Sequence, residues 1–269
     1  MEFSILGPLE VRADDRAVAL RGVTPRALLT VLLLRANQSV STEQLALSLW
    51  GDDAPPGSVK TVQVHISRLR KSLGDPAALV TTAGGYQLRV RPGELDVEHF
   101  ERSFEDGRQA LAAGDPDGAA AALHEALALW RGPPLAEVAA LPFAPSEITR
   151  LEERRLAALE LRVEADLQLG RHAELIAELQ HVTSEHPWRE RLHGQLMLAL
   201  YRSGRQADAL RTYRDARRVL VDELGIEPGR PLRELETAIL EQDPRLDLVP
   251  ASDEAGEPGS SFVGRDAQL

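Results

Sequence analysis

The side chains best suited to chemistry lie on one face of a helix predicted over residues 58–73. Apolar residues recur there at spacings of three and four, which predicts a buried stripe of Val59, Val62, Ile66, Leu69 and Leu73. The opposite face carries Lys60, Val64, Ser67, Arg68 and Lys71, with Thr61, Gln63, His65 and Arg70 on its flanks. Cationic and hydrogen-bonding side chains in this arrangement suit contacts to the phosphates and base edges of DNA.

Base recognition and phosphate binding are expected of different residues on this face. Arg68 can donate two hydrogen bonds to a guanine edge, Val64 can touch a thymine methyl group, and the small Ser67 permits close approach. Phosphate contacts are expected of Lys60, Thr61, His65, Arg70 and Lys71, and Gln63 completes the set of candidates. Arg70 lies nearer the buried stripe, so an internal ion pair is an equal alternative for it. The general alternative is a solvated basic face on an ordinary amphipathic helix.

Charge is distributed unevenly along the 269 residues. The whole chain carries −11, but residues 1–95 carry +2 and the remainder −13. Lys60 and Lys71 are the only lysines, and both lie in the predicted helix. Because binding to DNA phosphates depends on local positive charge, the overall acidity does not exclude nucleic acid.

A winged helix is predicted within residues 1–93. β-prone residues over 3–12 and 18–20 predict short antiparallel strands before the helices. A threonine followed by proline predicts the N-cap of a first helix at Thr24, with apolar residues at helical spacing as far as Asn37.

The second helix and the hairpin have equally local signals. Ser41 is the expected N-cap of a helix that continues to Trp50. After the helix of residues 58–73, strand-like runs over 79–82 and 86–90 flank an Ala-Gly-Gly turn and predict a β-hairpin. Three helices followed by a hairpin describe a winged helix.

Candidate DNA contacts also lie outside the helix of residues 58–73. Thr24 and Arg26 open the first helix, where free backbone N–H groups attract a phosphate, although capping alone accounts for Thr24. Trp50 is a candidate for backbone contact, with core packing as the alternative. Tyr86 is expected chiefly to anchor the hairpin on the core, with DNA contact as the alternative, and Thr82 is the candidate at the hairpin tip.

The run Thr61-Val-Gln-Val-His-Ile-Ser-Arg-Leu-Arg-Lys71, with Trp50-Gly51 before it and Gly85-Tyr86 after it, resembles the OmpR-type DNA-binding domain. The opening Ile5-Leu-Gly-Pro-Leu-Glu-Val11 resembles the Streptomyces antibiotic regulatory proteins, in which such a domain precedes a bacterial transcriptional activation domain. In OmpR-type domains the hairpin tip often carries an arginine near the position of Thr82. This sequence lacks that arginine, which argues against a minor-groove contact by the hairpin.

Residues 94–248 are predicted to form an all-helical, tetratricopeptide-like domain. Leu169-Gly-Arg-His-Ala-Glu174 resembles Ser203-Gly-Arg-Gln-Ala-Asp208, which places the two copies 34 residues apart, the tetratricopeptide period. Stacked helix pairs of this kind present a surface for a peptide or helix. Trp130 and Trp188 follow corresponding repeat helices and are expected to be packing residues.

Residues 249–269 are predicted to be a linker that leads to a possible further domain. The stretch over 251–261 is polar and rich in helix breakers. Residues 262–269 resemble the entry to the nucleotide-binding domain of larger regulators of the same family, and an ordinary tail is the equal alternative.

Enzyme classes find no support in the sequence. Neither lysine follows a glycine as a phosphate loop requires, His124-Glu125 lacks the second histidine of a zinc protease, and the absence of cysteine excludes thiolate chemistry. No catalytic, metal or cofactor site is therefore expected. The chain has no export signal and no long apolar run, which predicts a cytoplasmic protein without membrane contact.

The resemblance and the residues together predict a sequence-specific transcriptional activator, α+β in its first part and all-α in its second. Its expected partners are double-stranded promoter DNA, bound as a homodimer on direct repeats, and RNA polymerase holoenzyme including its sigma factor. The resemblance implies target genes of antibiotic or other secondary-metabolite biosynthesis. The alternatives are a tetratricopeptide adaptor, or a nucleotide-regulated signalling protein, in which the winged helix contacts protein.

Overall fold

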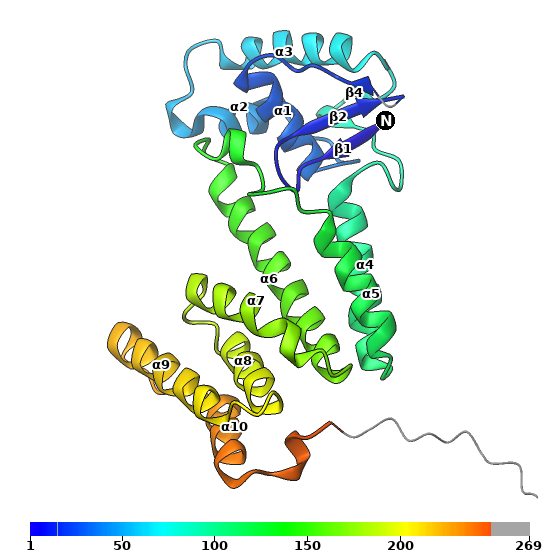
Figure 1. The fold of residues 1–269 in the computed structure, drawn as a ribbon. Coiled ribbons are helices and arrows are strands. Elements are labelled where there is room, and N and C mark those ends of the chain that lie inside the picture. The colour runs from blue at the N-terminus through cyan, green and yellow to red at the C-terminus, as the bar shows by residue number, and fades with distance from the viewer. Residues whose placement is uncertain (15, 249–269) are drawn as a thin grey trace, which may run out of the picture. The chain divides into compact units, whose positions relative to one another are not determined.

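A three-stranded antiparallel sheet begins the chain in the computed structural model, which describes residues 1–14 and 16–248 (Figure 1). β1 (Glu2–Ser4), β2 (Glu10–Ala13) and β3 (Arg16–Ala17) pair in that order. Phe3 lies opposite Val11, and both are buried, as expected for one face of a half-buried sheet. The prediction of a strand over residues 18–20 is wrong. The third strand comes earlier because the chain reverses at Asp14, whose φ is +46°.

Three helices follow the sheet: α1 (Val23–Leu34), α2 (Thr42–Trp50) and α3 (Ser58–Leu73), with a single 3-10 turn, η1 (Gly51–Asp53), after α2. The prediction that Thr24 caps α1 is wrong, because the helix begins one residue earlier and its N-cap is Gly22, with φ +89°. α1 also ends short of Asn37. The predicted cap of α2 is confirmed, since the Ser41 hydroxyl accepts a hydrogen bond from the Gln44 N–H and the Gln44 side chain accepts one from the Ser41 N–H.

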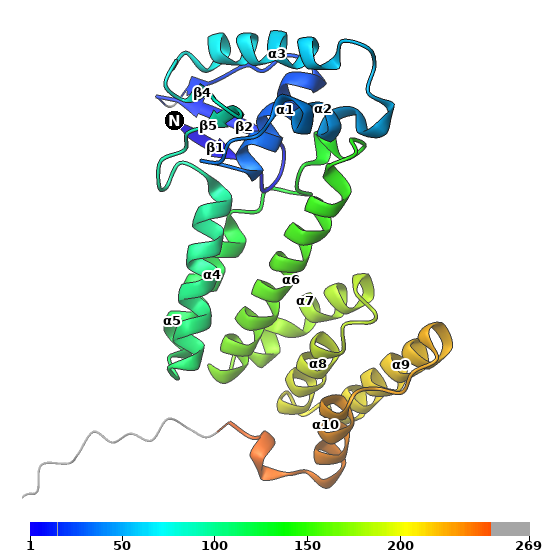
Figure 2. The ribbon, with the colours of Figure 1, turned by 180° about the vertical axis from the view of Figure 1, so that it is seen from behind.

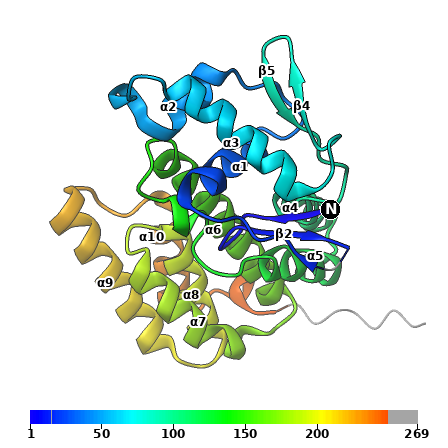
Figure 3. The same ribbon diagram turned by 90° about the horizontal axis from the view of Figure 1, so that it is seen from above.

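The hairpin of β4 (Leu79–Thr82) and β5 (Gly85–Leu88) completes the winged helix that the sequence predicts. β5 begins one residue earlier and ends sooner than the predicted strand over 86–90. The backbones of Val40 and Tyr86 exchange hydrogen bonds of 2.8 and 2.9 Å, so the segment between α1 and α2 runs beside the hairpin. In Figure 3 the hairpin projects alongside α3.

The first of two compact units, residues 1–171, also includes helices that follow the winged helix: α4 (Asp96–Ala112), α5 (Pro116–Ala128), the 3-10 turn η2 (Ala136–Val138) and α6 (Ala144–Gln168). Phe100 contacts Phe104 and Trp130, with ring centroids 6.1 and 5.4 Å apart. These rings belong to the same buried cluster as Leu28 and Ile66 of the winged helix. The core therefore continues across the predicted boundary at residue 93. Figures 1 and 2 show α4 and α5 on the side of this core away from α3.

Polar contacts reinforce the junction between the sheet and α4. The Asp96 carboxylate accepts hydrogen bonds from the backbone N–H groups of Ile5 and Leu6. The backbone N–H of Arg131 donates to the Leu6 carbonyl at 2.8 Å, and its guanidinium lies 2.7 Å from Glu10. Burial raises the pKa of Asp96 above its ordinary value, against the opposing effect of these N–H donors and Arg131.

The second unit, described over residues 172–248, is helical: α7 (His172–Glu185), α8 (Glu190–Arg202), α9 (Gln206–Leu224), α10 (Arg230–Glu241) and the 3-10 turn η3 (Pro244–Leu246). Gly204, with φ +74°, makes the turn into α9, and Gly170, with φ +79°, makes the equivalent turn into α7, as the repeat predicts. Trp130 is buried as expected. The prediction for Trp188 is wrong: it is 56% exposed and its indole N–H donates to Glu223 at 2.9 Å. The predicted linker lies outside the described residues.

Candidate DNA-binding surface

The outward face of α3 presents the side chains that the sequence selects for DNA. Lys60, Gln63, Val64, Ser67, Arg68 and Lys71 are all exposed. Val62, Ile66, Leu69 and Leu73 are buried on the opposite face. Val59 does not belong to the buried stripe as predicted: it is 38% exposed, because it lies in the first turn beside the exposed α2–α3 loop.

Local geometry fixes the ends of α3. Gly57 and Gly74 adopt left-handed conformations at its N-cap and C-cap, which other residues adopt only with strain. The Thr61 hydroxyl donates to the Gly57 carbonyl at 3.2 Å, so its oxygen remains only as an acceptor. Arg70 and Lys71 lie in the last turn, where positive charge is favourable to the helix dipole.

Three cations on this face are available to an anion. Lys60, Arg68 and Lys71 make no ion pair with any residue in the described part of the chain. Burial and the nearby Arg68 lower the pKa of His65 below the ordinary value of 6.5, which disfavours a fourth positive charge on this face. The face therefore combines three exposed cations with small or apolar side chains between them.

Arg70 is directed to the hairpin. Its Nε donates to the Leu79 carbonyl at 2.7 Å, and a terminal guanidinium nitrogen donates to the Thr81 hydroxyl at 2.6 Å. The guanidinium carbon lies 5.6 Å from the centre of the Tyr86 ring. These partners are neutral. Arg70 therefore makes hydrogen bonds within the protein, and not the internal ion pair that is its alternative in the sequence analysis.

The hairpin candidates are held by the segment between α1 and α2. The hydroxyls of Thr82 and Ser39 lie 2.6 Å apart, and Tyr86 is half-buried with its backbone bonded to Val40. A Cβ atom at Gly85 would lie 2.1 Å from the Val40 carbonyl oxygen, so only glycine permits this approach. The anchoring role expected of Tyr86 agrees with this geometry.

The three remaining candidates lie at the start of α1 and the end of α2. The Arg26 guanidinium donates to Glu137 at 2.6 Å and to the Leu9 carbonyl at 2.9 Å, which commits it to contacts within the protein. Thr24 is half-buried in the first turn, and Trp50 is half-buried against the core. Their DNA contacts stay predictions.

Two residues that position this surface escape sequence reasoning. Ser39 holds Thr82, and Glu137 holds Arg26, across 43 and 111 residues of chain. Neither has a local sequence signal, because serine and glutamate occur on any surface. The proline-rich stretch around Glu137 is the one feature that marks this region as unusual.

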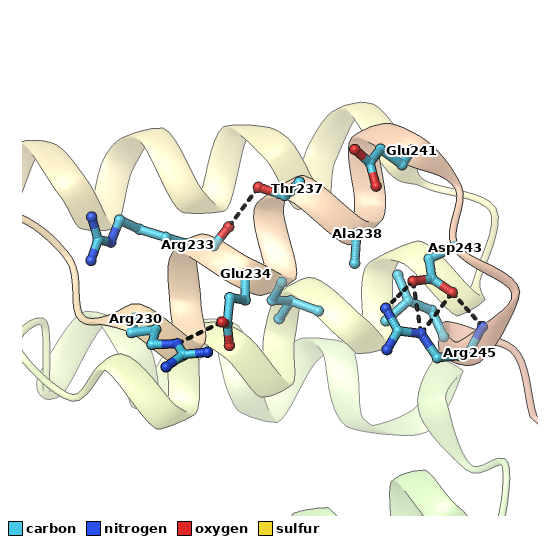
Figure 4. A pocket seen from close by; sticks show the side chains of 10 residues that line it. Arg230, Arg233, Glu234, Thr237, Ala238, Glu241, Asp243 and Arg245 are labelled. Atoms are coloured by element: carbon cyan, nitrogen blue, oxygen red, sulfur yellow. Dashed lines mark hydrogen bonds and ion pairs between the residues drawn. The ribbon is translucent and has the colours of Figure 1, made fainter.

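A cavity of about 800 Å³ beside α10 and η3 is a weaker candidate for function (Figure 4). Its charges largely satisfy one another: Arg230 bonds to Glu234 at 2.6 Å, and Arg245 bonds to Asp243. Over residues 1–14 and 16–248, no group of acidic or histidine side chains is arranged to hold a metal ion. None of the helices in these residues has the length and apolarity needed to cross a bilayer.

Both parts of the chain match known domain families. Residues 19–88 match the family described as "Transcriptional regulatory protein, C terminal", and residues 95–240 match the "Bacterial transcriptional activator domain". A winged helix with an exposed basic helix, followed by this activator domain, defines a transcriptional regulator.

Relatives with the same combination include regulatory protein DnrI of Streptomyces peucetius, 40% identical over 257 residues that cover 92% of this chain and 94% of DnrI. Regulatory protein AfsR of Streptomyces coelicolor is 44% identical over 91% of this chain, which spans about a quarter (25%) of AfsR. The solved structure of Mycobacterium tuberculosis EmbR in complex with a low-affinity phosphopeptide superimposes with a TM-score of 0.87 at 36% identity, covering 90% of this chain and 65% of EmbR. This chain belongs to the Streptomyces antibiotic regulatory protein family.

Proposed function

We propose that this chain is a sequence-specific activator that inserts α3 into the major groove of promoter DNA. The observation that carries the proposal is the exposed face of α3, where Lys60, Arg68 and Lys71 have no internal ion pair and flank Val64 and Ser67. An α-helix fits the major groove, and arginine is suited to a guanine edge. Family membership and the activator domain support a role in transcription.

The proposal includes a mode of assembly and a class of target. Two copies bind direct repeats about one helical turn apart, in head-to-tail order. The helical region then contacts RNA polymerase holoenzyme, including its sigma factor. The genes activated belong to secondary-metabolite biosynthesis, a proposal that membership in the Streptomyces antibiotic regulatory protein family supports.

Salt dependence and two substitutions test the role of α3. Sequences are first selected from random DNA with the full chain, and binding is then measured at several salt concentrations. Arg68→Ala should relax base preference at one position by about 1–3 kcal/mol. Lys71→Ala should weaken all sequences alike and reduce the slope of log K against log salt by about 0.9. Arg108→Ala, which removes an exposed cation paired with Glu105 in α4, is the matched control and should change neither property.

Three outcomes would contradict this proposal in whole or in part. If no duplex is recovered, or if binding is insensitive to salt, the adaptor alternative is favoured. Protection of an inverted repeat in a promoter footprint would refute the head-to-tail arrangement. The nucleotide-regulated alternative depends on residues 262–269, which lie outside the described residues, and a phosphate loop encoded after Leu269 would favour it.

A further inference from the structure

Arg70 joins α3 to both strands of the hairpin. It donates one hydrogen bond to the backbone of Leu79 and one to the side chain of Thr81, both in β4. It also lies over the ring of Tyr86 in β5. A planar guanidinium satisfies these three partners together, because its donors are fixed in one plane and its face stacks on an aromatic ring.

The other contacts that anchor the hairpin come from a different element. The Asn37 N–H donates to the Leu88 carbonyl at 2.9 Å, the Ser39 hydroxyl contacts Thr82, and Val40 pairs with Tyr86. All of these fix the hairpin to the segment between α1 and α2. Arg70 supplies the connection to the helix that carries the candidate base contacts.

The distribution of charge around Arg70 favours a role in positioning the hairpin over a role in binding phosphate. The hairpin from Leu79 to Leu88 contains no lysine or arginine, so any contact that it makes with DNA is uncharged. The guanidinium of Arg70 faces neutral oxygens and a ring in the protein. Lys71, its neighbour in the chain, is exposed and has no such partners.

We propose that Arg70 is a positioning residue that holds the β4–β5 hairpin beside α3, so that Thr82 and the hairpin backbone approach the DNA backbone next to the groove that α3 enters. This rests on the proposed function, because it states how the same surface is arranged. Arg70 itself binds no phosphate.

Two substitutions test the contact from its two ends. Arg70→Lys keeps the positive charge but loses the planar pair of donors. Thr81→Val keeps the β-branched shape of residue 81 and leaves Arg70 charged, but it removes the hydroxyl oxygen that accepts the hydrogen bond from Arg70. Thr81→Ser, which keeps the hydroxyl, is the matched control for the second change, and Arg70→Gln removes the charge for comparison.

Hydrogen exchange of the free chain measures the positioning directly. The hairpin amides from Thr81 to Tyr86 should exchange several-fold faster in Arg70→Lys and Thr81→Val, with α3 amides unchanged and Thr81→Ser like the native chain. Binding to a duplex selected with the native chain should weaken about three- to tenfold in both variants, as expected for the loss of one or two hydrogen bonds. The double variant should lose little more than either single variant.

The salt slope distinguishes positioning from phosphate binding. Because Arg70 neutralises no phosphate in this proposal, Arg70→Gln should keep the native slope, whereas Lys71→Gln should lower it by about 0.9. The proposal is overturned if Arg70→Lys binds like the native chain, if Arg70→Gln lowers the slope, or if hairpin exchange is unchanged in Thr81→Val. Failure of the native chain to bind DNA would refute the proposed function instead, since the exchange experiment needs no DNA.

Discussion

Replacement of Asp96 by alanine should strongly destabilise the first compact unit. The Asp96 carboxylate lies 2.8 and 2.9 Å from the Ile5 nitrogen and 2.9 Å from the Leu6 nitrogen, and its side chain is only 9% exposed. Ile5 and Leu6 are themselves buried. Alanine at position 96 leaves two buried N–H donors without the acceptor that they have in the native chain.

The magnitude follows from those two donors. Each buried donor left without a partner costs about 1–3 kcal/mol, so Asp96→Ala should reduce the free energy of unfolding by about 2–6 kcal/mol. The loss of the Arg131 contact adds little, because that distance is 3.7 Å and Arg131 keeps Glu10 at 2.7 Å. A loss of this size is a large share of the 5–15 kcal/mol, roughly, that stabilises a typical domain.

Urea unfolding of the full chain measures this loss, with Glu98→Ala as the matched control. Glu98 is another carboxylate in the first turn of α4, so its removal tests the effect of the helix dipole alone, expected to be below about 1 kcal/mol. If Asp96→Ala and Glu98→Ala shift the transition equally, the two N–H donors do not need Asp96 and the reasoning is refuted.

Three further predictions concern the same unit. The raised pKa of Asp96 favours its neutral form in the folded chain. The free energy of unfolding of the native chain, relative to that of Asp96→Asn, should therefore fall as pH rises from 3.8 through the raised pKa. Urea titrations at successive pH values measure this difference in free energy, and an increase with pH would contradict the prediction. Gly85→Ala should cost about 2–4 kcal/mol and expose hairpin amides to exchange, because its Cβ would meet the Val40 carbonyl, and native-like exchange would exclude the clash. Ser41→Ala should lower the midpoint of thermal unfolding through a loss of about 1 kcal/mol of capping, whereas Ser48→Ala in the same helix should cost less; equal effects would discount the cap.

The sequence predicts α3 to the residue because every signal for it is local. Gly57 and Gly74 mark its ends, and the three-four spacing defines its buried face except for Val59 in the first turn. The hairpin and the cap at Ser41 are equally local features, which is why their predicted positions agree closely with the structure. The orientation of the basic face follows from helical periodicity alone.

Contacts between distant residues account for what sequence reasoning could not predict. Thr24 followed by proline is a sound capping signal, but Gly22 allows α1 to start earlier. In the sequence, nothing distinguishes Arg70 from any other arginine on the flank of a helix. Its partners in the hairpin become apparent only in the folded structure. Asp96 gives no sign of its role, because its donors lie about 90 residues earlier in the chain.

The negative charge of this chain is unevenly distributed within the first compact unit. Residues 96–171 carry −7 and belong to the same compact unit as α3, whereas residues 1–95 carry +2. α4 has 17 residues and is therefore about 25 Å long, more than twice the Debye length of about 10 Å at 0.1 M salt. Since α4 extends away from α3 (Figure 2), the negative charge near the far end of α4 is screened from the DNA that we propose α3 to contact. At low salt, where screening is weaker, we expect this charge to disfavour approaches of DNA other than the one that we propose for α3.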